Sequence, residues 1–233
     1  MKLVLISDTH NNHRYLTSKG MGNILPEGDL LIHAGDITGL GHKGEVESVF
    51  EWFKEVAPRY THGVVFIAGN HDRSFDPKFN IENTTRKPTW LQEKLGDLPS
   101  NVCYLENTSV TLGGIKIWGS PITPWFYGDH WGFNKHRGAD INNVWSEIPS
   151  DIDVLITHGP PLGYGDLTVM DRKYVGCEEL RHKIREIKPK LHVFGHIHEG
   201  YDVYDYEEDT IFVNASICTL NYEPTNKPIV IEL

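Results

Sequence analysis

Short apolar runs rich in Val, Ile and Leu recur along the 233 residues of this chain, and segments with helical periodicity lie between several of them. Near-continuous apolar runs of this length are typical of strands that are covered on both faces. The runs predict strands at Leu3–Ile6, Leu30–Ile32, Val64–Ile67, Ile115–Trp118, Val154–Thr157, Leu191–Phe194, Ile211–Val213 and Ile229–Ile231.

The segments between these runs predict helices. Apolar residues follow helical spacing over Val46–Val56, which ends before Pro58, and over Trp90–Leu95 and Leu180–Ile187. Strands that alternate with helices predict βαβ units, so we expect a sheet that is at least partly parallel. No linker, repeat or low-complexity tract divides residues 1–233, and we interpret them as one α/β domain.

The composition is that of a globular protein and excludes several classes. The chain has 32 acidic and 22 basic residues and a net charge of −10, and no Lys/Arg cluster marks a second phosphate pocket. This disfavours long polyphosphates as substrates, and we expect no binding to duplex nucleic acid. Cys103, Cys177 and Cys218 are too few and too far apart for a disulfide framework or a Cys-based zinc site. No apolar run approaches membrane length, and we expect a cytoplasmic protein without a membrane partner. The oligomeric state stays open.

Five of the predicted strands are followed by turns that carry Asp, Asn or His. These turns are Ser7-Asp8-Thr9-His10, Ala34-Gly35-Asp36, Gly69-Asn70-His71-Asp72, His158-Gly-Pro-Pro161 and Gly195-His196-Ile197-His198. In open α/β sheets, ligands bind beyond the carboxyl ends of the strands, so we expect the five turns to meet at one site. Taken singly, each turn has a plain structural alternative, such as a helix cap, an Asx turn or a surface loop.

As a set, the turns predict a metal centre. They supply carboxylate, amide and imidazole ligands and no thiolate: Asp8, His10, Asp36, Asn70, His158, His196 and His198. Such a set suits Mn²⁺, Fe or Zn²⁺ better than Ca²⁺ or Mg²⁺ alone. These ligands are too many for one ion but suit two divalent ions that share a carboxylate. Ions spaced about 3.5–4 Å apart clamp a phosphate and activate water.

The five motifs, in this order and over essentially the whole chain, resemble those of the calcineurin-like metallophosphoesterase superfamily. Further segments resemble the metallophosphoesterase-domain-containing branch, which is related to class III cyclic nucleotide phosphodiesterases. These segments are Gly119–Trp125, Thr157–Gly163, Lys190–Gly195, Asn214–Ser216 and Pro224–Asn226. The resemblance implies two packed mixed β-sheets flanked by helices, a four-layer αββα sandwich.

The resemblance also implies a role for each candidate ligand. The first metal would be held by Asp8, His10 and His198. The second metal would be held by Asn70, His158 and His196, with Asp36 as the bridge. Some vertebrate members of the branch have glycine where this chain has His196, so the resemblance implies a complete metal pair here.

Two further residues have an implied catalytic role. His71 would lie beside the phosphate and stabilise the transition state or protonate the leaving oxygen, and Asp72 would orient its imidazole. The branch often has Glu at the position of Asp72. The residues alone leave two alternatives open: His71 could support a ligand by hydrogen bonding, and Asp72 could cap a helix.

Candidate substrate contacts lie in and after a dense aromatic segment, Trp118–Phe133. Trp125 could stack on a nucleobase, and Arg137 and Tyr164 could contact a phosphate or a sugar, in addition to Asn70 and His71 at the phosphate. The alternative is that these rings pack a long loop onto the body of the protein.

We therefore expect a metal-dependent phosphoester hydrolase in which a hydroxide that bridges two metal ions attacks phosphorus. Phosphodiesters such as cyclic nucleotides are the leading substrate class, and a small phosphoester or nucleotide is the expected partner. Two alternatives stay open. One is a phosphomonoesterase, including a protein phosphatase, and the other is a catalytically silent nucleotide-binding module.

Overall fold

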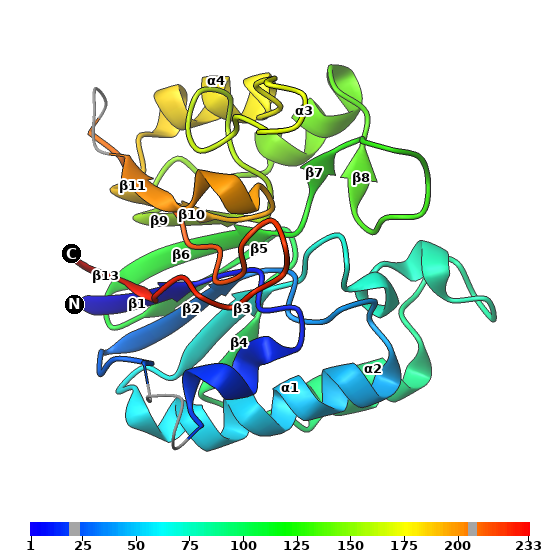
Figure 1. Ribbon diagram of the computed structural model, residues 1–233, viewed down its shortest axis with the longest axis vertical. Coiled ribbons are helices and arrows are strands. Elements are labelled where there is room, and N and C mark those ends of the chain that lie inside the picture. The colour runs from blue at the N-terminus through cyan, green and yellow to red at the C-terminus, as the bar shows by residue number, and fades with distance from the viewer. Residues whose placement is uncertain (19–23, 205–208) are drawn as a thin grey trace.

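Two mixed β-sheets pack face to face at the centre of the molecule (Figure 1). The computed structural model describes residues 1–18, 24–204 and 209–233. The first sheet has the strand order β13 (Ile229–Glu232), β1 (Lys2–Ile6), β2 (Leu30–Ala34), β3 (Val64–Ile67) and β4 (Val102–Tyr104). Strands β1 to β4 are parallel, and β13 pairs with β1 in the antiparallel direction.

The second sheet has a parallel centre and antiparallel edges. Its order is β11 (Asp202–Tyr204), β12 (Ile211–Asn214), β10 (Leu191–Phe194), β9 (Val154–Thr157), β6 (Ile115–Ser120) and β5 (Thr108–Leu112). Strands β12, β10, β9 and β6 run parallel, while β11 and β5 are antiparallel to their neighbours. A short parallel pair, β7 (Thr123–Pro124) and β8 (Asn134–Lys135), lies beyond β6 along the chain.

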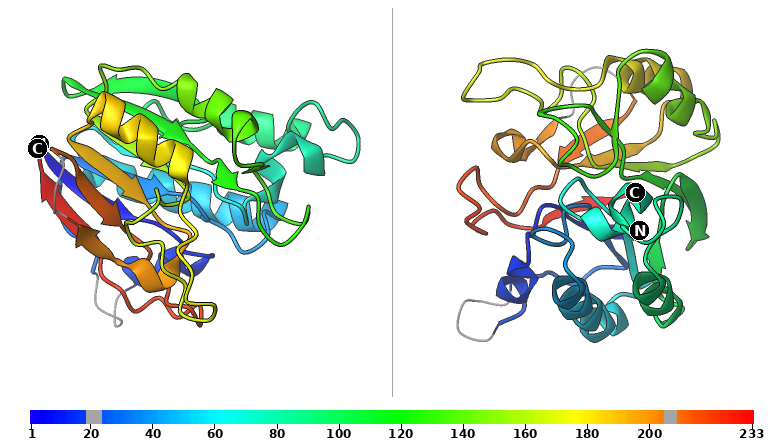
Figure 2. Two further views of the ribbon diagram at one scale, coloured as in Figure 1. Left: turned by 90° about the horizontal axis from the view of Figure 1, so that it is seen from above. Right: turned by 90° about the vertical axis from the view of Figure 1, so that its right-hand side faces the viewer.

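Helices cover the outer face of each sheet (Figures 1 and 2). The first sheet is covered by α1 (Lys43–Val56) and α2 (Thr89–Gly96), and the second by α3 (Ala139–Ser146) and α4 (Glu178–Ile187). Five short 3-10 helices complete the described elements: Asn12–Leu16, Ala57–Arg59, Arg73–Phe75, Pro77–Phe79 and His198–Gly200. The four-layer sandwich, the eight strands and the three helices expected from the sequence are confirmed.

Alternation along the strands divides the core into two parts. In β1, Leu3 and Leu5 face the apolar layer between the sheets, whereas Val4 and Ile6 pack with α1 residues such as Phe53. The side chains of Leu3, Val4, Leu5 and Ile6 are completely buried, because both faces of the strand are covered. Within the described residues, no helix is long and apolar enough to cross a membrane.

The two sheets are joined at the carboxyl end of β1. Ser7 donates its backbone N–H to Ala215 of the second sheet at 2.8 Å, and its carbonyl accepts from the Ile217 N–H at 2.8 Å. This link brings the turns after β1 and β2 next to the turns after β9 and β10. The segments that carry the candidate ligands therefore open at one edge of the sandwich.

Candidate metal centre

Side chains from five strand ends converge at this edge, as the sequence predicts. They are Asp8, His10, Asp36, Asn70, His158, His196 and His198. All are buried except His196 and His198, which are mostly buried. Three groups of donor atoms each fall within 4.8 Å of one another, which is the spacing that one ion needs.

The first group combines the turn after β1 with the turn after β10. Nε2 of His198 lies 3.4 Å from Oδ1 of Asp8 and 3.2 Å from Nε2 of His10. The Asp8 carboxylate is held in place by hydrogen bonds, because its Oδ2 accepts from the Ser216 hydroxyl at 2.8 Å and from the His196 backbone N–H at 3.0 Å. One carboxylate and two imidazoles thus face a common point.

The second group lies around Asp36, between the turns after β2, β3 and β9. Nε2 of His158 lies 3.3 Å from Oδ2 of Asp36 and 2.9 Å from Oδ1 of Asn70. The same Oδ2 is 3.7 Å from Nε2 of His10, which belongs to the first group. Asp36 therefore stands between the two groups, at the position that a bridging carboxylate requires, and His196 completes the second group with Asp36 and His158.

The imidazoles of the site are oriented by backbone carbonyls. Nδ1 of His158 lies 2.9 Å from the carbonyl of Ala34, and Nδ1 of His198 lies 2.9 Å from that of Thr219. Because a carbonyl can only accept, Nδ1 carries the proton of the neutral ring, and the Nε2 lone pair faces the cluster. This is the tautomer that a metal ion binds.

Glycines permit the close approach of these turns. A Cβ atom on Gly195 would lie 2.0 Å from Oδ2 of Asp8, and one on Gly69 would lie 2.2 Å from Oδ1 of Asp36. Four of the candidate ligands also have positive φ: Asp8, His10, Asp36 and His196. Such backbone conformations cost of the order of 1–3 kcal/mol each and cluster at functional sites.

Charges inside the cluster shift the pKa values in opposite directions. Burial acts to lower the pKa of His198, but the hydrogen bond and charge of Asp8 raise it to about 9. Burial also acts to lower the pKa of His158, but the charge of Asp36 raises it to about 9. Burial dominates at His10, where it lowers the pKa to about 4. The carboxylates of Asp8 and Asp36 thus favour positive charge on the imidazoles that they contact, and the buried oxygen and nitrogen donors of the cluster fit divalent cations.

His71 lies at the rim of the cluster. Its ring contacts those of His10 and Trp131, with both centroid distances 4.5 Å, and it is half-buried. Nδ1 lies 2.6 Å from the carbonyl of Gly39, and the backbone N–H donates to Oδ1 of Asp36 at 2.8 Å. His71 also falls within 4.8 Å of His10 and Asp36 donor atoms, so the geometry alone permits a ligand role.

Comparison with known proteins identifies the family. The family model for calcineurin-like phosphoesterases matches residues 1–200. This chain belongs to the calcineurin-like phosphoesterase family.

Curated relatives support the same assignment. Metallophosphoesterase domain-containing protein 1 of Homo sapiens is 42% identical over 243 residues, which cover 100% of this chain and 71% of that protein. UPF0046 protein C25E10.12 of Caenorhabditis elegans is 36% identical over 242 residues, which cover 100% of this chain and 81% of that protein. The crystal structure of a phosphopantetheinyl hydrolase from Mycobacterium tuberculosis shares the fold, with a TM-score of 0.54 and 14% identity over 98% of this chain and 95% of that one.

Family membership supports a metal-dependent phosphoester hydrolase. Calcineurin-like phosphoesterases use a dinuclear metal centre, and the buried Asp/His groups of this chain are placed to form one.

The contact expected between Asp72 and the His71 imidazole is absent, and the structure corrects this prediction. Asp72 is buried and accepts hydrogen bonds from the backbone N–H groups of Ile37, Thr38 and Gly69 and from the Thr38 hydroxyl. It makes no side-chain cap of the short helix that follows it. Burial, and next the Asp36 charge, raise the pKa of Asp72 to about 7. Its carboxyl group joins the turns after β2 and β3.

Two of the expected substrate contacts lie together in a cavity of about 200 Å³ beside the centre. Trp125 and Arg137 line it with Phe126 and His196, both of which also line the metal-facing cavity. The Arg137 guanidinium already donates to the carbonyls of Gly176 and Val175 at 2.9 and 2.6 Å. Arg137 thus forms part of the wall of this cavity, and the structure does not support the expected contact with phosphate.

The substrate contact expected of Tyr164 is wrong. Its side chain is buried in the core and stacks on Phe212, with ring centroids 3.9 Å apart. The guanidinium of Arg181 lies 4.4 Å from the centroid of the Tyr164 ring. It lines neither of the two cavities at the centre.

The sequence did not indicate Tyr222 as part of the site. Its ring packs against His10, His198 and His71, with centroid distances of 4.8, 5.4 and 6.1 Å. Tyr222 lines the metal-facing cavity, which has a volume of about 220 Å³. The other described residues that line this cavity are Asp36, Asn70, His71, Phe126, Trp131, His196, His198, Glu199 and Leu220. Tyr222 lies between the segments Asn214–Ser216 and Pro224–Asn226, and neither segment includes it.

Proposed function

We propose that this protein is a phosphodiesterase that hydrolyses small diesters, with cyclic nucleotides as the leading substrates. The observation that carries the proposal is the position of Asp36, whose Oδ2 lies 3.3 Å from His158 and 3.7 Å from His10. One carboxylate shared by two ligand groups is what a pair of ions requires.

In this proposal each candidate ligand keeps the role expected from the family resemblance. Asp8, His10 and His198 would hold one divalent ion, Asn70, His158 and His196 would hold the other, and Asp36 would contribute to both sites. The metals are Mn²⁺, Fe or Zn²⁺, because the donors are imidazole, carboxylate and amide. When bound, the ions would polarise the phosphate and lower the pKa of a water at the site.

The protein supplies the remaining groups. His71 presents Nε2 to the cavity, since Nδ1 is held by the Gly39 carbonyl, and a proton on Nε2 can pass to the departing alkoxide. Asn70 and His71 lie at the phosphate, and Phe126 and Trp131 exclude water from one side.

The cavity walls favour a diester over a monoester. Among the described residues that line the metal-facing cavity there is no Lys or Arg, and Glu199 adds a negative charge. A phosphodiester carries one negative charge, whereas a monoester carries nearly two at neutral pH. The adjoining cavity, lined by Pro124, Trp125, Phe126 and Tyr127, is suited to a flat nucleobase.

We also propose that the substrate is the only partner needed for activity, without duplex nucleic acid or membrane, and that the protein acts in the cytoplasm. The thiols of Cys103, Cys177 and Cys218 are unpaired, which suits a reducing compartment.

The test compares bis(p-nitrophenyl) phosphate, p-nitrophenyl phosphate and 3′,5′-cyclic AMP after loading with Mn²⁺, Fe²⁺ or Zn²⁺, with metal analysis of the same samples. We expect about two ions per chain and higher kcat/KM for the two diesters. Faster hydrolysis of the monoester would favour a phosphomonoesterase or protein phosphatase. Metal-loaded protein that binds cyclic AMP but hydrolyses none of the three would favour the catalytically silent binding module.

A further inference from the structure

Arg73 is a cation without an anionic partner. Its Cζ lies 5.2 Å from the centroid of the Trp131 ring and 5.7 Å from that of Phe79. Its side chain forms no hydrogen bond or ion pair with any residue that the structure describes, and its Nε is buried without an acceptor. A guanidinium always carries charge, and a buried donor without an acceptor is costly, so the position favours binding of an anion.

This guanidinium lies beside the proposed leaving-group histidine. The Trp131 ring that contacts Arg73 also contacts the imidazole of His71, with a centroid distance of 4.5 Å. Trp131 is fixed by its surroundings: its carbonyl accepts from the Lys78 ammonium at 2.6 Å, and the next residue, Gly132, donates to the Asn70 carbonyl at 2.9 Å. Arg73 therefore lies on the side of the centre from which His71 would protonate the departing oxygen.

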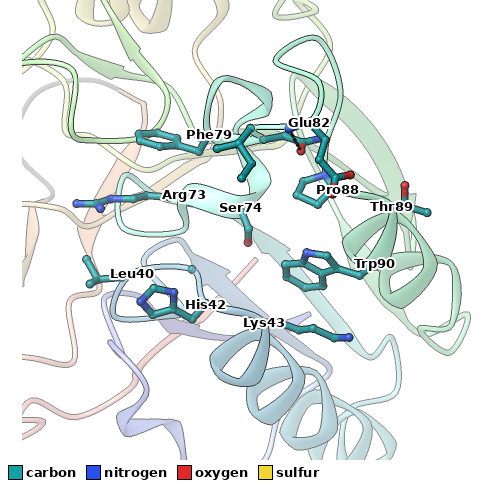
Figure 3. Close-up of a pocket in the computed structure, with 13 residues that line it drawn as sticks. Leu40, His42, Lys43, Arg73, Ser74, Phe79, Glu82, Pro88, Thr89 and Trp90 are labelled. Atoms are coloured by element: carbon teal, nitrogen blue, oxygen red, sulfur yellow. Dashed lines mark hydrogen bonds between the residues drawn. The ribbon is translucent and has the colours of Figure 1, made fainter.

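Arg73 also lines a groove with a volume of about 610 Å³ (Figure 3). The side chain runs between Phe79 and Leu40, and its guanidinium points away from Pro88 and Trp90. Glu82, the acidic residue of the lining, is at the other end of the view. The hydroxyl of Ser74, which also lines the groove, is buried and has no hydrogen-bond partner.

The groove walls can contact the uncharged part of a ligand. Leu40, Phe79, Ile81, Pro88 and Trp90 give the groove mainly apolar sides. Ile81 is 98% exposed at its edge. A ligand that combines an apolar or aromatic body with one anionic group would match both the walls and Arg73.

We propose that, for acyclic phosphodiesters, whose leaving alcohol departs as a separate molecule, this groove receives that alcohol, and that Arg73 selects alcohols that carry a carboxylate or a phosphate. The inference rests on the proposed phosphodiesterase activity. In the reaction, water forms a new P–O bond and the bond to the leaving alcohol breaks. The proton from His71 goes to the alcohol oxygen, and the proton lost by water restores His71. The second anion on the alcohol takes no part in the chemistry and serves only in binding.

A matched pair of synthetic diesters tests this proposal. One is ethyl 3-(carboxymethyl)phenyl phosphate, and the other is its carbamoylmethyl analogue, in which the methylene group keeps the acidity of the two phenols nearly equal. We expect kcat/KM of the metal-loaded wild-type protein to be about tenfold to a hundredfold higher for the carboxylate, the range of a charge-assisted hydrogen bond.

Variants locate the preference. In Arg73→Gln we expect the ratio of the two kcat/KM values to fall to about one, and in Arg73→Lys to an intermediate value, because Lys keeps the charge but not the planar stacking. Arg86→Gln is the matched control, since Arg86 is exposed on the same segment and does not line the groove, and it should keep the wild-type ratio.

The outcomes distinguish failure of the proposed role of the groove from failure of the proposed phosphodiesterase activity. Hydrolysis of both diesters at equal kcat/KM by the wild-type protein would overturn the role of the groove and leave the phosphodiesterase activity standing. A wild-type ratio retained in both Arg73→Gln and Arg73→Lys would have the same consequence. If neither diester is hydrolysed by protein that contains two metal ions, the proposed function fails and this inference fails with it.

Discussion

Nδ1 of His71 lies 2.6 Å from the backbone carbonyl of Gly39. Since the carbonyl can only accept, Nδ1 carries a proton whether the ring is neutral or charged, and Nε2 is the atom that can exchange a proton with a ligand. A backbone atom of the loop after β2, and not the carboxylate of Asp72, therefore orients the proposed general acid.

Replacement of His71 tests its role as a proton donor. In His71→Gln we expect kcat to fall by about 10²–10⁴ for a diester with an alkoxide leaving group, the usual contribution of general acid catalysis. The loss should be much smaller for bis(p-nitrophenyl) phosphate, because nitrophenolate departs without a proton. The measurement is kcat for both substrates, together with metal content.

Metal content separates this role from that of a ligand. His71→Gln should keep both metal ions, and His182→Gln, which replaces an exposed histidine of α4, should change neither kcat nor metal content. Loss of one ion in His71→Gln would instead assign His71 as a ligand with His10 and Asp36.

Removal of the shared carboxylate should affect both metal sites. In Asp36→Ala we expect metal content to fall from two ions per chain to below one and turnover to become undetectable, because Oδ2 faces both His10 and His158. Asp151→Ala is the control, since Asp151 is exposed and pairs with Lys116 at the surface. Near-normal activity of Asp36→Ala with unchanged metal content would contradict the ligand assignment.

A single added methyl group should disturb the centre without removing any ligand. In Gly195→Ala the new Cβ would lie 2.0 Å from Oδ2 of Asp8, so the carboxylate or the β10 turn must move. We expect metal affinity to fall at least tenfold, measured by titration with Mn²⁺. Gly96→Ala in α2 is the matched control, because no described atom beyond its chain neighbours and the nearby backbone of its own helix lies within 4 Å of the Cβ position, and it should bind metal as the wild type does.

Much of the fold and of the cluster could be predicted because the signals are local. Runs such as Val64–Ile67 are buried on both faces and therefore apolar throughout, which marks them clearly. Strand β5 and helix α3, which the sequence analysis did not predict, lack such a clear apolar pattern. Strand β5 is an edge strand with exposed Thr and Ser side chains, and α3 has only two buried residues. The candidate ligands come directly after buried strands, so the strand predictions placed them.

The errors concern residues whose role depends on tertiary neighbours. Asp72 follows His71 in sequence, but its carboxylate bonds to Thr38, 34 positions away. Tyr164 follows the His158 motif, yet its ring stacks on Phe212 in the core. Tyr222 reaches the site from a turn just before the segment Pro224–Asn226, which does not include it. The position of Arg73 is defined by its contacts with the rings of Phe79 and Trp131. Sequence spacing contains no information on these contacts.

His192 should make the folded protein sensitive to acid. The imidazole is completely buried in β10, and burial lowers its pKa to about 3. The Thr157 hydroxyl donates to the Gly159 carbonyl at 2.7 Å, so Nε2 of His192 must donate to the hydroxyl oxygen at 2.8 Å, and Nδ1 is buried without a partner. The folded state therefore holds His192 neutral.

The direction of the pH effect follows from the two pKa values. In the unfolded chain the histidine binds a proton below about pH 6.5, whereas in the folded chain it does so only below about pH 3. Between these values the unfolded state binds more protons, so the free energy of unfolding falls on acidification, by up to about 1.4 kcal/mol per pH unit from this residue. Above pH 6.5 the residue contributes no pH dependence.

Urea unfolding between pH 7.5 and 4.5, with a chelator present to remove metal linkage, measures this effect. We expect His192→Gln to be less stable than the wild type at pH 7.5, because the buried packing is disturbed, but to lose less stability on acidification. His182→Gln should follow the wild-type curve, since its side chain is exposed. Parallel curves for His192→Gln and the wild type would show that His192 is not held neutral by burial, because its removal would then leave proton uptake on unfolding unchanged.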